Sequence, residues 1–309
     1  MEQVVKKKKK FNPGNAQLWM LSIVPAALVF LFSYVPMFGI IIAFKDYKFA
    51  RGIFGSEWNG FDNFQYLLSS TTFGRITRNT LVMNLIFIFV GLVAAVSLAV
   101  VLYRLTSRRF TKVYQTILIT PNFLSWVVVA YMAYAILHPQ NGTLNGLLES
   151  FGMKPVDWYG KPGAWPWILM VANTWKHVGM NSVIYYAALM GIDSSLFEAA
   201  EVDGATQRQV TRYILIPCIT SVMIMLTILN IGSIFRADFG LFYQVTRNVG
   251  ALYETTDVID TYVFRSLRAA NTNMGVTAAI GLLQSVVGLV MVVTTNYIVG
   301  KIDPDSQLF

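Results

Sequence analysis

The sequence predicts an all-α integral membrane protein. Of its 309 residues, 55% are hydrophobic and only 13% are charged, and several uncharged apolar runs exceed 20 residues. Soluble domains contain about 25% charged residues, so this composition does not suit a water-exposed globule. A helix needs about 20 apolar residues to cross the hydrocarbon layer. No segment shows the alternation of a membrane β-barrel, so the spans are predicted to be helices.

Six transmembrane helices are predicted from these runs. The first two contain no charged residue, whereas the fourth is interrupted by Lys176 and His177. Between the first two spans, residues 61–68 have apolar side chains at helical spacing, which indicates a short helix at the membrane surface. The six predicted spans are Leu18–Phe44, Thr80–Tyr103, Gln115–Leu137, Pro166–Met190, Tyr213–Phe235 and Met274–Val299.

Basic residues predict the orientation of the chain. A run of five lysines at residues 6–10 precedes the first span, and residues 104–114 carry four basic residues and no acidic one. Because basic residues concentrate on the cytosolic side, we expect both termini to be cytosolic (N-in/C-in). The predicted organisation is a basic N-terminus (residues 1–17), a six-helix domain (18–299) and a cytosolic tail (300–309). The net charge of +8 then reflects membrane flanks rather than nucleic-acid binding.

Several kinds of catalytic chemistry are missing from the sequence. It has no G-x-x-x-x-G-K-[ST] phosphate loop, no H-E-x-x-H metal motif and no G-x-S-x-G nucleophile motif. Acidic residues are nearly excluded from the spans, which disfavours a proton relay. We therefore expect a non-enzymatic membrane protein that binds no cofactor, and whose energy for any uphill movement comes from another protein.

The predicted cytosolic loop at residues 191–217 has a distinct pattern. Ser195 and Glu198 have the spacing of a capping box, which starts a helix. Asp203-Gly204 supplies the end, because glycine adopts the left-handed conformation common after a helix. The sequence thus predicts a helix of about two turns, followed by a second helix that starts near Ala205 and runs through Pro217 into the fifth span.

This loop resembles the EAA motif of permease subunits in binding-protein-dependent ABC importers. The resemblance rests on Glu198-Ala199-Ala200, Asp203-Gly204-Ala205 and Ile214-Leu215-Ile216-Pro217, with Ile216 where leucine is usual. In that family the short helix is the coupling helix, which sits in a groove of the ATP-hydrolysing subunit. The alternative is a capped helix that packs only on its own bundle. The implied coupling residues are Ser195, Leu196, Phe197, Glu198, Ala199, Ala200, Asp203, Gly204, Ala205 and Pro217.

The resemblance extends over nearly the whole chain. Residues 60–64 and 78–81 are similar to sugar permeases of the maltose type, and residues 278–309 to the LplB type. It implies an ABC type I importer permease fold in the bacterial plasma membrane, and an oligosaccharide or complex glycan as substrate. The implied partners are a second homologous permease (a heterodimer), two ATPase subunits that bind ATP and Mg²⁺, and an extracellular solute-binding protein.

The helices on either side of the coupling loop are expected to line the substrate path. Sugars require amide, hydroxyl and aromatic side chains that exchange hydrogen bonds with water. Asn173, His177 and Asn181 share one helical face, although interhelical hydrogen bonding would explain them as well. Lys176 is expected to face the cavity or a partner subunit, and Arg236 could instead be an interfacial anchor. The candidates are Asn173, Trp175, Lys176, His177, Asn181, Asn230, Ser233, Phe235 and Arg236.

Three other interpretations remain at this point. The same architecture could import a non-sugar solute. A secondary carrier or channel would work without ATP. A membrane enzyme is the third, and the missing catalytic motifs disfavour it.

Overall fold

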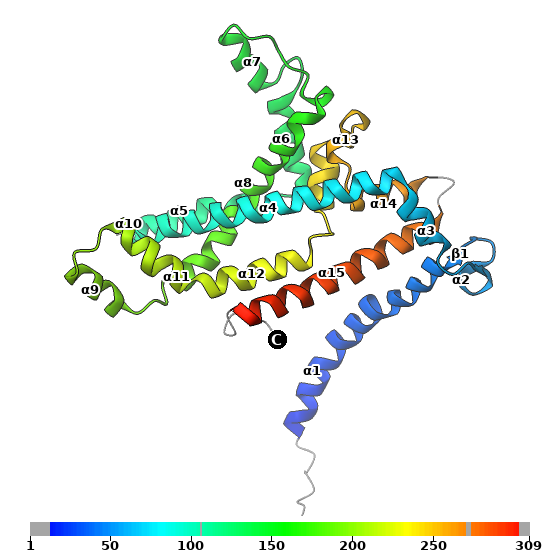
Figure 1. Cartoon of the computed structure of the whole chain (residues 1–309), viewed down its shortest axis with the longest axis horizontal. Coiled ribbons are helices and arrows are strands. Elements are labelled where there is room, and N and C mark those ends of the chain that lie inside the picture. The colour runs from blue at the N-terminus through cyan, green and yellow to red at the C-terminus, as the bar shows by residue number, and fades with distance from the viewer. Residues whose placement is uncertain (1–12, 106, 270–272, 303–309) are drawn as a thin grey trace, which may run out of the picture. The chain divides into compact units, whose positions relative to one another are not determined.

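The structure is a computed structural model that describes residues 13–105, 107–269 and 273–302 (Figure 1). The predicted basic run at residues 6–10 and the tail from residue 303 lie outside the described residues. The chain forms two compact units. Unit 1 extends to Tyr66 and includes Asn273–Leu282, and unit 2 contains Leu67 to Thr272 together with the chain from Leu283 onward.

Unit 1 begins with a long apolar helical stretch and ends in a small hairpin region. Asn63 ties this region together, because its amide donates to the backbone oxygens of Ala43 (2.9 Å) and Lys45 (3.0 Å). The short helix predicted at residues 61–68 is present as α3. The elements are α1 (Pro13–Val29), η1 (Phe30–Tyr34), η2 (Val35–Phe44), β1 (Lys45–Asp46), α2 (Gly52–Gly55), β2 (Glu57–Trp58) and α3 (Asp62–Ser69).

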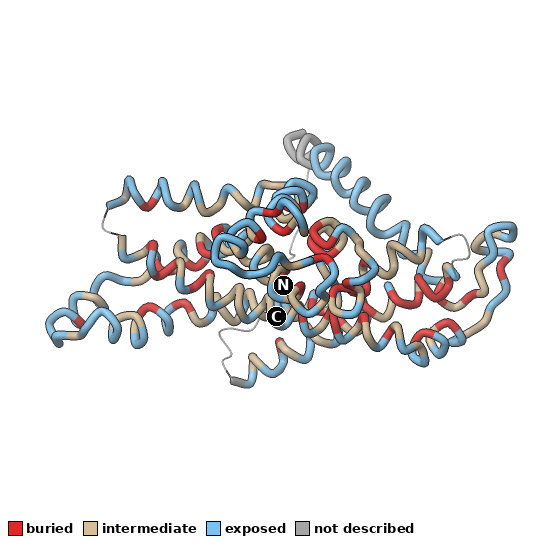
Figure 2. Tube along the Cα trace, turned by 90° about the horizontal axis from the view of Figure 1, so that it is seen from above, coloured by how far each residue is buried: buried red, intermediate tan, exposed pale blue. Residues whose placement is uncertain are grey.

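Unit 2 is organised around α4, which packs along α8 over most of its length. Buried positions recur along both helices among exposed ones, as expected for helices that pack on one side. Figure 2 shows the same alternation of buried and exposed positions along the helices of the chain. One core cluster surrounds Trp165 and Leu169 of α8, and a second surrounds Ala95 and Ala99 of α4. The long elements are α4 (Thr71–Tyr103), α5 (Arg108–Ile119), α6 (Trp126–Leu137), α8 (Trp165–Leu189) and α12 (Thr220–Gly232), and the short η3 (Thr120–Phe123) joins α5 to α6.

Shorter elements complete unit 2. They connect the long helices. They are α7 (Thr143–Ser150), η4 (Trp158–Gly160), η5 (Pro162–Ala164), α9 (Ser194–Val202), α10 (Gln207–Val210), η6 (Thr211–Leu215), α11 (Ile216–Cys218), η7 (Leu241–Val245), η8 (Gly250–Leu252), α13 (Tyr253–Thr256) and α14 (Ile259–Arg268). The final helix, α15 (Met274–Ile302), contributes its first turns to unit 1 and the remainder to unit 2.

The predicted third and fifth spans are not single straight helices. Within the described residues, three helices are long and apolar enough to cross a membrane, or up to five spans if two bent helix pairs are counted. The third predicted span bends by 96° between η3 and α6. Pro121 lies in the first turn of η3, which ends at Phe123, and the Ser125 hydroxyl caps the start of α6. The fifth bends by 56° after Pro217. The sequence pattern showed length and apolarity but not these bends.

Candidate functional site

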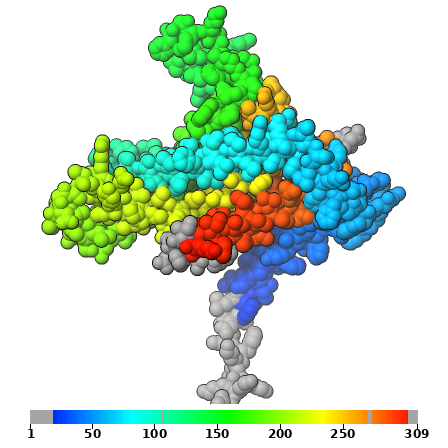
Figure 3. Space-filling model, in the orientation of Figure 1, coloured from blue at the N-terminus to red at the C-terminus, as the bar shows by residue number. Residues whose placement is uncertain are grey.

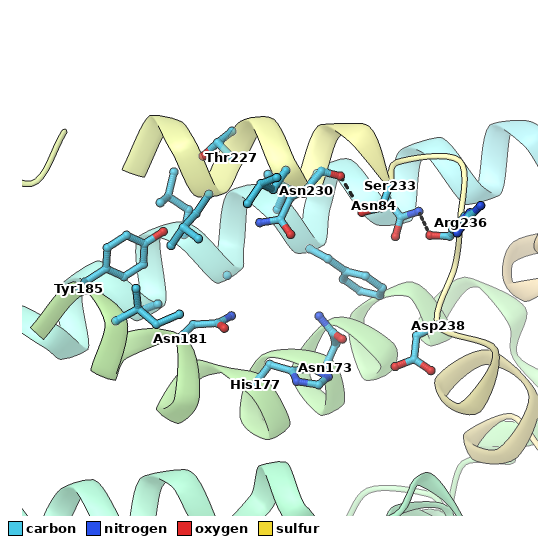
Figure 4. Close-up of a pocket in the computed structure, with 18 residues that line it drawn as sticks. Asn84, Asn173, His177, Asn181, Tyr185, Thr227, Asn230, Ser233, Arg236 and Asp238 are labelled. Atoms are coloured by element: carbon cyan, nitrogen blue, oxygen red, sulfur yellow. Dashed lines mark hydrogen bonds between the residues drawn. The ribbon is translucent and has the colours of Figure 1, made fainter. Parts of the chain in front are cut away.

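Unit 2 contains a cavity of about 500 Å³ between α4, α8 and α12 (Figure 4). Side chains from all three helices point into it, and the segment that follows α12 closes one end. The lining is rich in amides and hydroxyls, and it includes one arginine and one aspartate. The polar lining residues are Asn84, Asn173, His177, Asn181, Tyr185, Thr227, Asn230, Ser233, Arg236 and Asp238.

Six of the nine candidate path residues line this one cavity. Asn173, His177 and Asn181 lie along α8, at successive turns of the face that the sequence predicted. Across from them, Asn230, Ser233 and Arg236 come from the end of α12 and the segment after it. Asn173, Asn181 and Asn230 make no side-chain hydrogen bond to any residue that the structure describes, so their amides are available to a ligand.

The other three candidates lie outside the cavity lining. Trp175 is exposed on α8, and Phe235 is half-buried. Lys176 is 5% exposed, and its ammonium donates to the backbone oxygens of Pro121 (3.4 Å), Asn122 (2.9 Å) and Leu124. The expectation that its charge needs the cavity or a partner subunit is therefore corrected. The bend between η3 and α6 exposes carbonyls that bind the ammonium within this chain, as cations do at helix C-termini.

The segment after α12 is unwound, and three side chains hold it. Asn84 donates to the backbone oxygens of Ile234 (2.7 Å) and Arg236 (3.0 Å), and Gln284 donates to that of Phe235 (2.7 Å). The Asp260 carboxylate accepts from the Ala237 amide at 2.7 Å. Burial raises the pKa of Asp260, and this hydrogen bond partly offsets the rise. These contacts fix the backbone that carries Arg236 at the cavity wall.

Sequence reasoning missed four of the polar lining residues: Asn84, Tyr185, Thr227 and Asp238. Asn84 could have been found, because it is the only amide in the uncharged span Thr80–Tyr103. Asp238 could not, because it lies beyond the predicted span. It accepts a hydrogen bond from the Trp126 indole at 2.7 Å, which joins the start of α6 to the end of the cavity.

The predicted coupling helix is present as α9, which lies at the surface at one end of unit 2 (Figure 3). The N-cap residue of α9 is Asp193 and not the predicted Ser195. The Asp193 carboxylate accepts a hydrogen bond from the Ser195 amide at 2.9 Å. This hydrogen bond lowers the pKa of Asp193. Gly204 ends the helix at φ +69°, with Ala205 donating to the Ala200 carbonyl at 2.9 Å.

Helix α9 contacts the end of α4. The rings of Tyr103 and Phe197 are 6.0 Å apart, and Ala200 is buried. The Arg104 guanidinium, just after α4, donates to the Gln207 carbonyl and the Thr211 hydroxyl. Leu196 and Val202 remain 45% and 88% exposed, which leaves an apolar surface on α9. The helix is therefore joined to a cavity-lining helix on one side and uncovered on the other.

The second helix of the loop starts slightly later than predicted. The Thr206 hydroxyl and the Gln209 side chain form a capping box, so α10 begins at Gln207 rather than near Ala205. A π-helical turn at η6 then precedes Pro217. Pro217 lacks the amide hydrogen that would bond to the Tyr213 carbonyl, and the helix stops at Cys218 and restarts at Thr220.

A bundle of apolar helices around a polar cavity, with a capped helix at one end, defines a membrane permease. The chain belongs to the family of binding-protein-dependent transport system inner membrane components, whose family model matches residues 87–304. It is accordingly a multi-pass transport protein of the bacterial plasma membrane rather than a catalytic enzyme. The resemblance to ABC importer permeases stated from the sequence is confirmed.

Curated relatives and solved structures match most of the chain. It is 31% identical to protein LplB of Bacillus subtilis, over 99% of both chains. It is 32% identical to the polygalacturonan/rhamnogalacturonan transport system permease protein YteP of the same species, over 91% of this chain and 87% of that protein. A chain of a bacterial ABC transporter that imports the acidic polysaccharide alginate has a TM-score of 0.85 at 31% identity, covering 94% of this chain and 97% of that one.

Proposed function

We propose that this chain is one permease subunit of an ATP-driven importer for an oligosaccharide or complex glycan, and that it forms half of the translocation pore. The observation that carries the proposal is the cavity lined by the amides of Asn173, Asn181 and Asn230, none of which bonds to another residue that the structure describes. Amides and hydroxyls can exchange hydrogen bonds with sugar hydroxyls without trapping them. The named relatives that transport polygalacturonan, rhamnogalacturonan and alginate support a sugar substrate.

In this proposal the chain crosses the membrane six times, with both termini in the cytosol. The three long helices and the two bent pairs supply five spans, and α8 supplies the sixth. The Lys176 ammonium does not oppose this assignment, because three backbone carbonyls solvate it.

The energy in this proposal comes from partner proteins. This chain binds no cofactor, and ATP and Mg²⁺ bind to two ATPase subunits. The exposed face of α9 docks on an ATPase, and Tyr103 and Arg104 transmit its movement to α4 and hence to the cavity. A second, different permease completes the pore, and an extracellular binding protein delivers the substrate. A solved alginate transporter bound to its periplasmic protein supports that last partner.

Reconstitution of the complete importer tests the proposal. The complex with its binding protein, in proteoliposomes, should take up an oligosaccharide only when ATP and Mg²⁺ are supplied on the ATPase side. Uptake by this chain alone without ATP would show a secondary carrier instead. ATP-dependent uptake of a non-sugar solute, with no uptake of any oligosaccharide, would show a permease of different specificity.

Replacing Gly204 with valine should uncouple ATP hydrolysis from uptake. The left-handed conformation at φ +69° costs a β-branched residue roughly 1–3 kcal/mol, so the end of α9 must change. We expect uptake to fall about tenfold while the assembled complex still hydrolyses ATP. Gly204→Asn is the matched control, because asparagine tolerates this conformation. Wild-type transport by an assembled Gly204→Val complex would contradict the coupling assignment.

Replacing Asn173 and Asn181 together with leucine should weaken transport without weakening the fold. Neither amide bonds to another described residue, so only contacts to the substrate are lost. Loss of two neutral hydrogen bonds predicts a drop of about tenfold in uptake at subsaturating substrate. Met180→Leu, on the same helix but outside the cavity, is the control. An unchanged uptake rate in the double variant would remove α8 from the path.

A further inference from the structure

A second pocket lies away from the cavity, between α6 and the segment around η7. Its volume is about 330 Å³. On η7, Leu241, Phe242 and Val245 are buried in the core, whereas the half-buried Tyr243 and Gln244 line the pocket. We call this the Arg247 pocket. Its lining residues are Val127, Ala130, Tyr131, Tyr134, Tyr243, Gln244, Arg247 and Asn248.

Arg247 is the unusual member of this lining. Its guanidinium lies over the Tyr134 ring, 3.9 Å from the ring centroid. It has no hydrogen bond or ion pair to any side chain or carbonyl in the described part of the chain. A guanidinium carries five donors in a planar fork that matches a carboxylate. The ring therefore orients a cation whose donors are all available.

The backbone that carries the Arg247 guanidinium has a strained conformation. Arg247 and Asn248 both have left-handed backbones, at φ 56° and 51°, which non-glycine residues seldom adopt. The Asn248 side chain fixes the turn, because its Oδ1 accepts from the Tyr253 hydroxyl (2.9 Å) and from Arg265 Nη1 (3.3 Å). Strained positions that the surroundings hold in place cluster at functional sites.

Helix α6 links the lining of the pocket to the end of the cavity. Trp126, whose indole bonds to Asp238 at the end of the cavity, lies two turns before Tyr134 on the same helix. The two residues thus mark two contacts between α6 and the segment 238–248: Trp126 with Asp238, and Tyr134 with Arg247.

We propose that the Arg247 pocket is a subsite for a carboxylated sugar residue, such as a uronic acid, of the transported oligosaccharide. The Arg247 guanidinium binds the carboxylate through two parallel N–H···O bonds, and the exposed ring of Tyr131 covers the apolar face of the sugar. This assignment rests on the proposed oligosaccharide import. Gln244 and Asn248 add amides at the pocket wall.

Binding of a galacturonate pentamer to the assembled permease–ATPase complex, without binding protein, tests the subsite. Arg247→Gln should weaken binding about tenfold, because a charge-assisted hydrogen-bond pair is lost. Arg247→Lys should restore part of the lost binding, because lysine keeps the positive charge but lacks the paired donors of the guanidinium. The matched control is Arg268→Gln, since Arg268 also lies on an aromatic ring (Phe264, 4.4 Å) but outside the pocket. The same series is repeated in an Arg236→Gln background, so that the arginine of the cavity does not contribute to pentamer binding.

Two further measurements identify the ligand. A carboxyl-reduced, neutral pentamer should bind wild type and Arg247→Gln equally weakly. Equal affinity of the wild type for both pentamers, or equal galacturonate binding with and without Arg247, would overturn the subsite. If Arg247→Gln instead raises the binding-protein concentration that half-saturates ATP hydrolysis, with pentamer binding unchanged, the pocket holds a protein carboxylate and the proposal is wrong. Continued ATP-driven oligosaccharide uptake in these cases would leave the proposed function standing.

Discussion

Replacing Gly179 with alanine is expected to prevent stable assembly of the importer. A Cβ atom at this position would lie 1.8 Å from the Leu118 carbonyl oxygen and 2.3 Å from its carbon. Both atoms are backbone atoms of α5, so no side-chain rotation can relieve the overlap. The helices must separate, and the bend that follows α5 must move with them. Overpacking of this kind costs roughly 1–3 kcal/mol and occasionally more.

The control for this prediction is Gly74→Ala on α4. Nothing lies within 4 Å of a Cβ at Gly74, so alanine there should be neutral or slightly stabilising because it favours helix. The measurement is the amount of intact complex recovered in detergent, with its thermal unfolding midpoint. Equal recovery and equal midpoints for the two variants would show that α5 and α8 are not in backbone contact at Gly179.

Replacing Lys176 with methionine is expected to destabilise unit 2 and, through it, transport. Methionine keeps the apolar stem but removes the donor that the backbone oxygens of Pro121, Asn122 and Leu124 share, although the Pro121 oxygen still accepts from the Leu124 amide at 3.2 Å. Each buried polar group that loses its partner costs about 1–3 kcal/mol. The contact of the ammonium with the Trp126 ring, at 5.3 Å, is lost as well. The bend between η3 and α6 should then loosen.

Thermal unfolding of the assembled complex separates this role from a role in the substrate path. Lys176→Met should lower the unfolding midpoint, whereas Lys112→Met, at an exposed position on α5, should not. If Lys176→Met reduces uptake while the midpoint stays at the wild-type value, Lys176 acts on the substrate, as the sequence alone had suggested.

The sequence predicted the helical membrane class, the polar face of α8 and the short helix before the fifth span. It could do so because apolar length, a repeat of four residues and a glycine stop are local signals. The partners of Lys176 could not be predicted, since they are carbonyls more than 50 residues away in the sequence. The cap at Asp193 was missed because Ser195 offered an equally plausible local pattern.

The unwound segment after α12 was also invisible in the sequence, because its hydrogen-bond donors and acceptor come from α4, α14 and α15. Its consequence concerns evolution. Substitutions at Asp260 or Gln284 would reposition Arg236 without altering any residue of the cavity lining. Related permeases can therefore differ in selectivity through the residues that hold the segment after α12, while the residues that line the cavity stay the same.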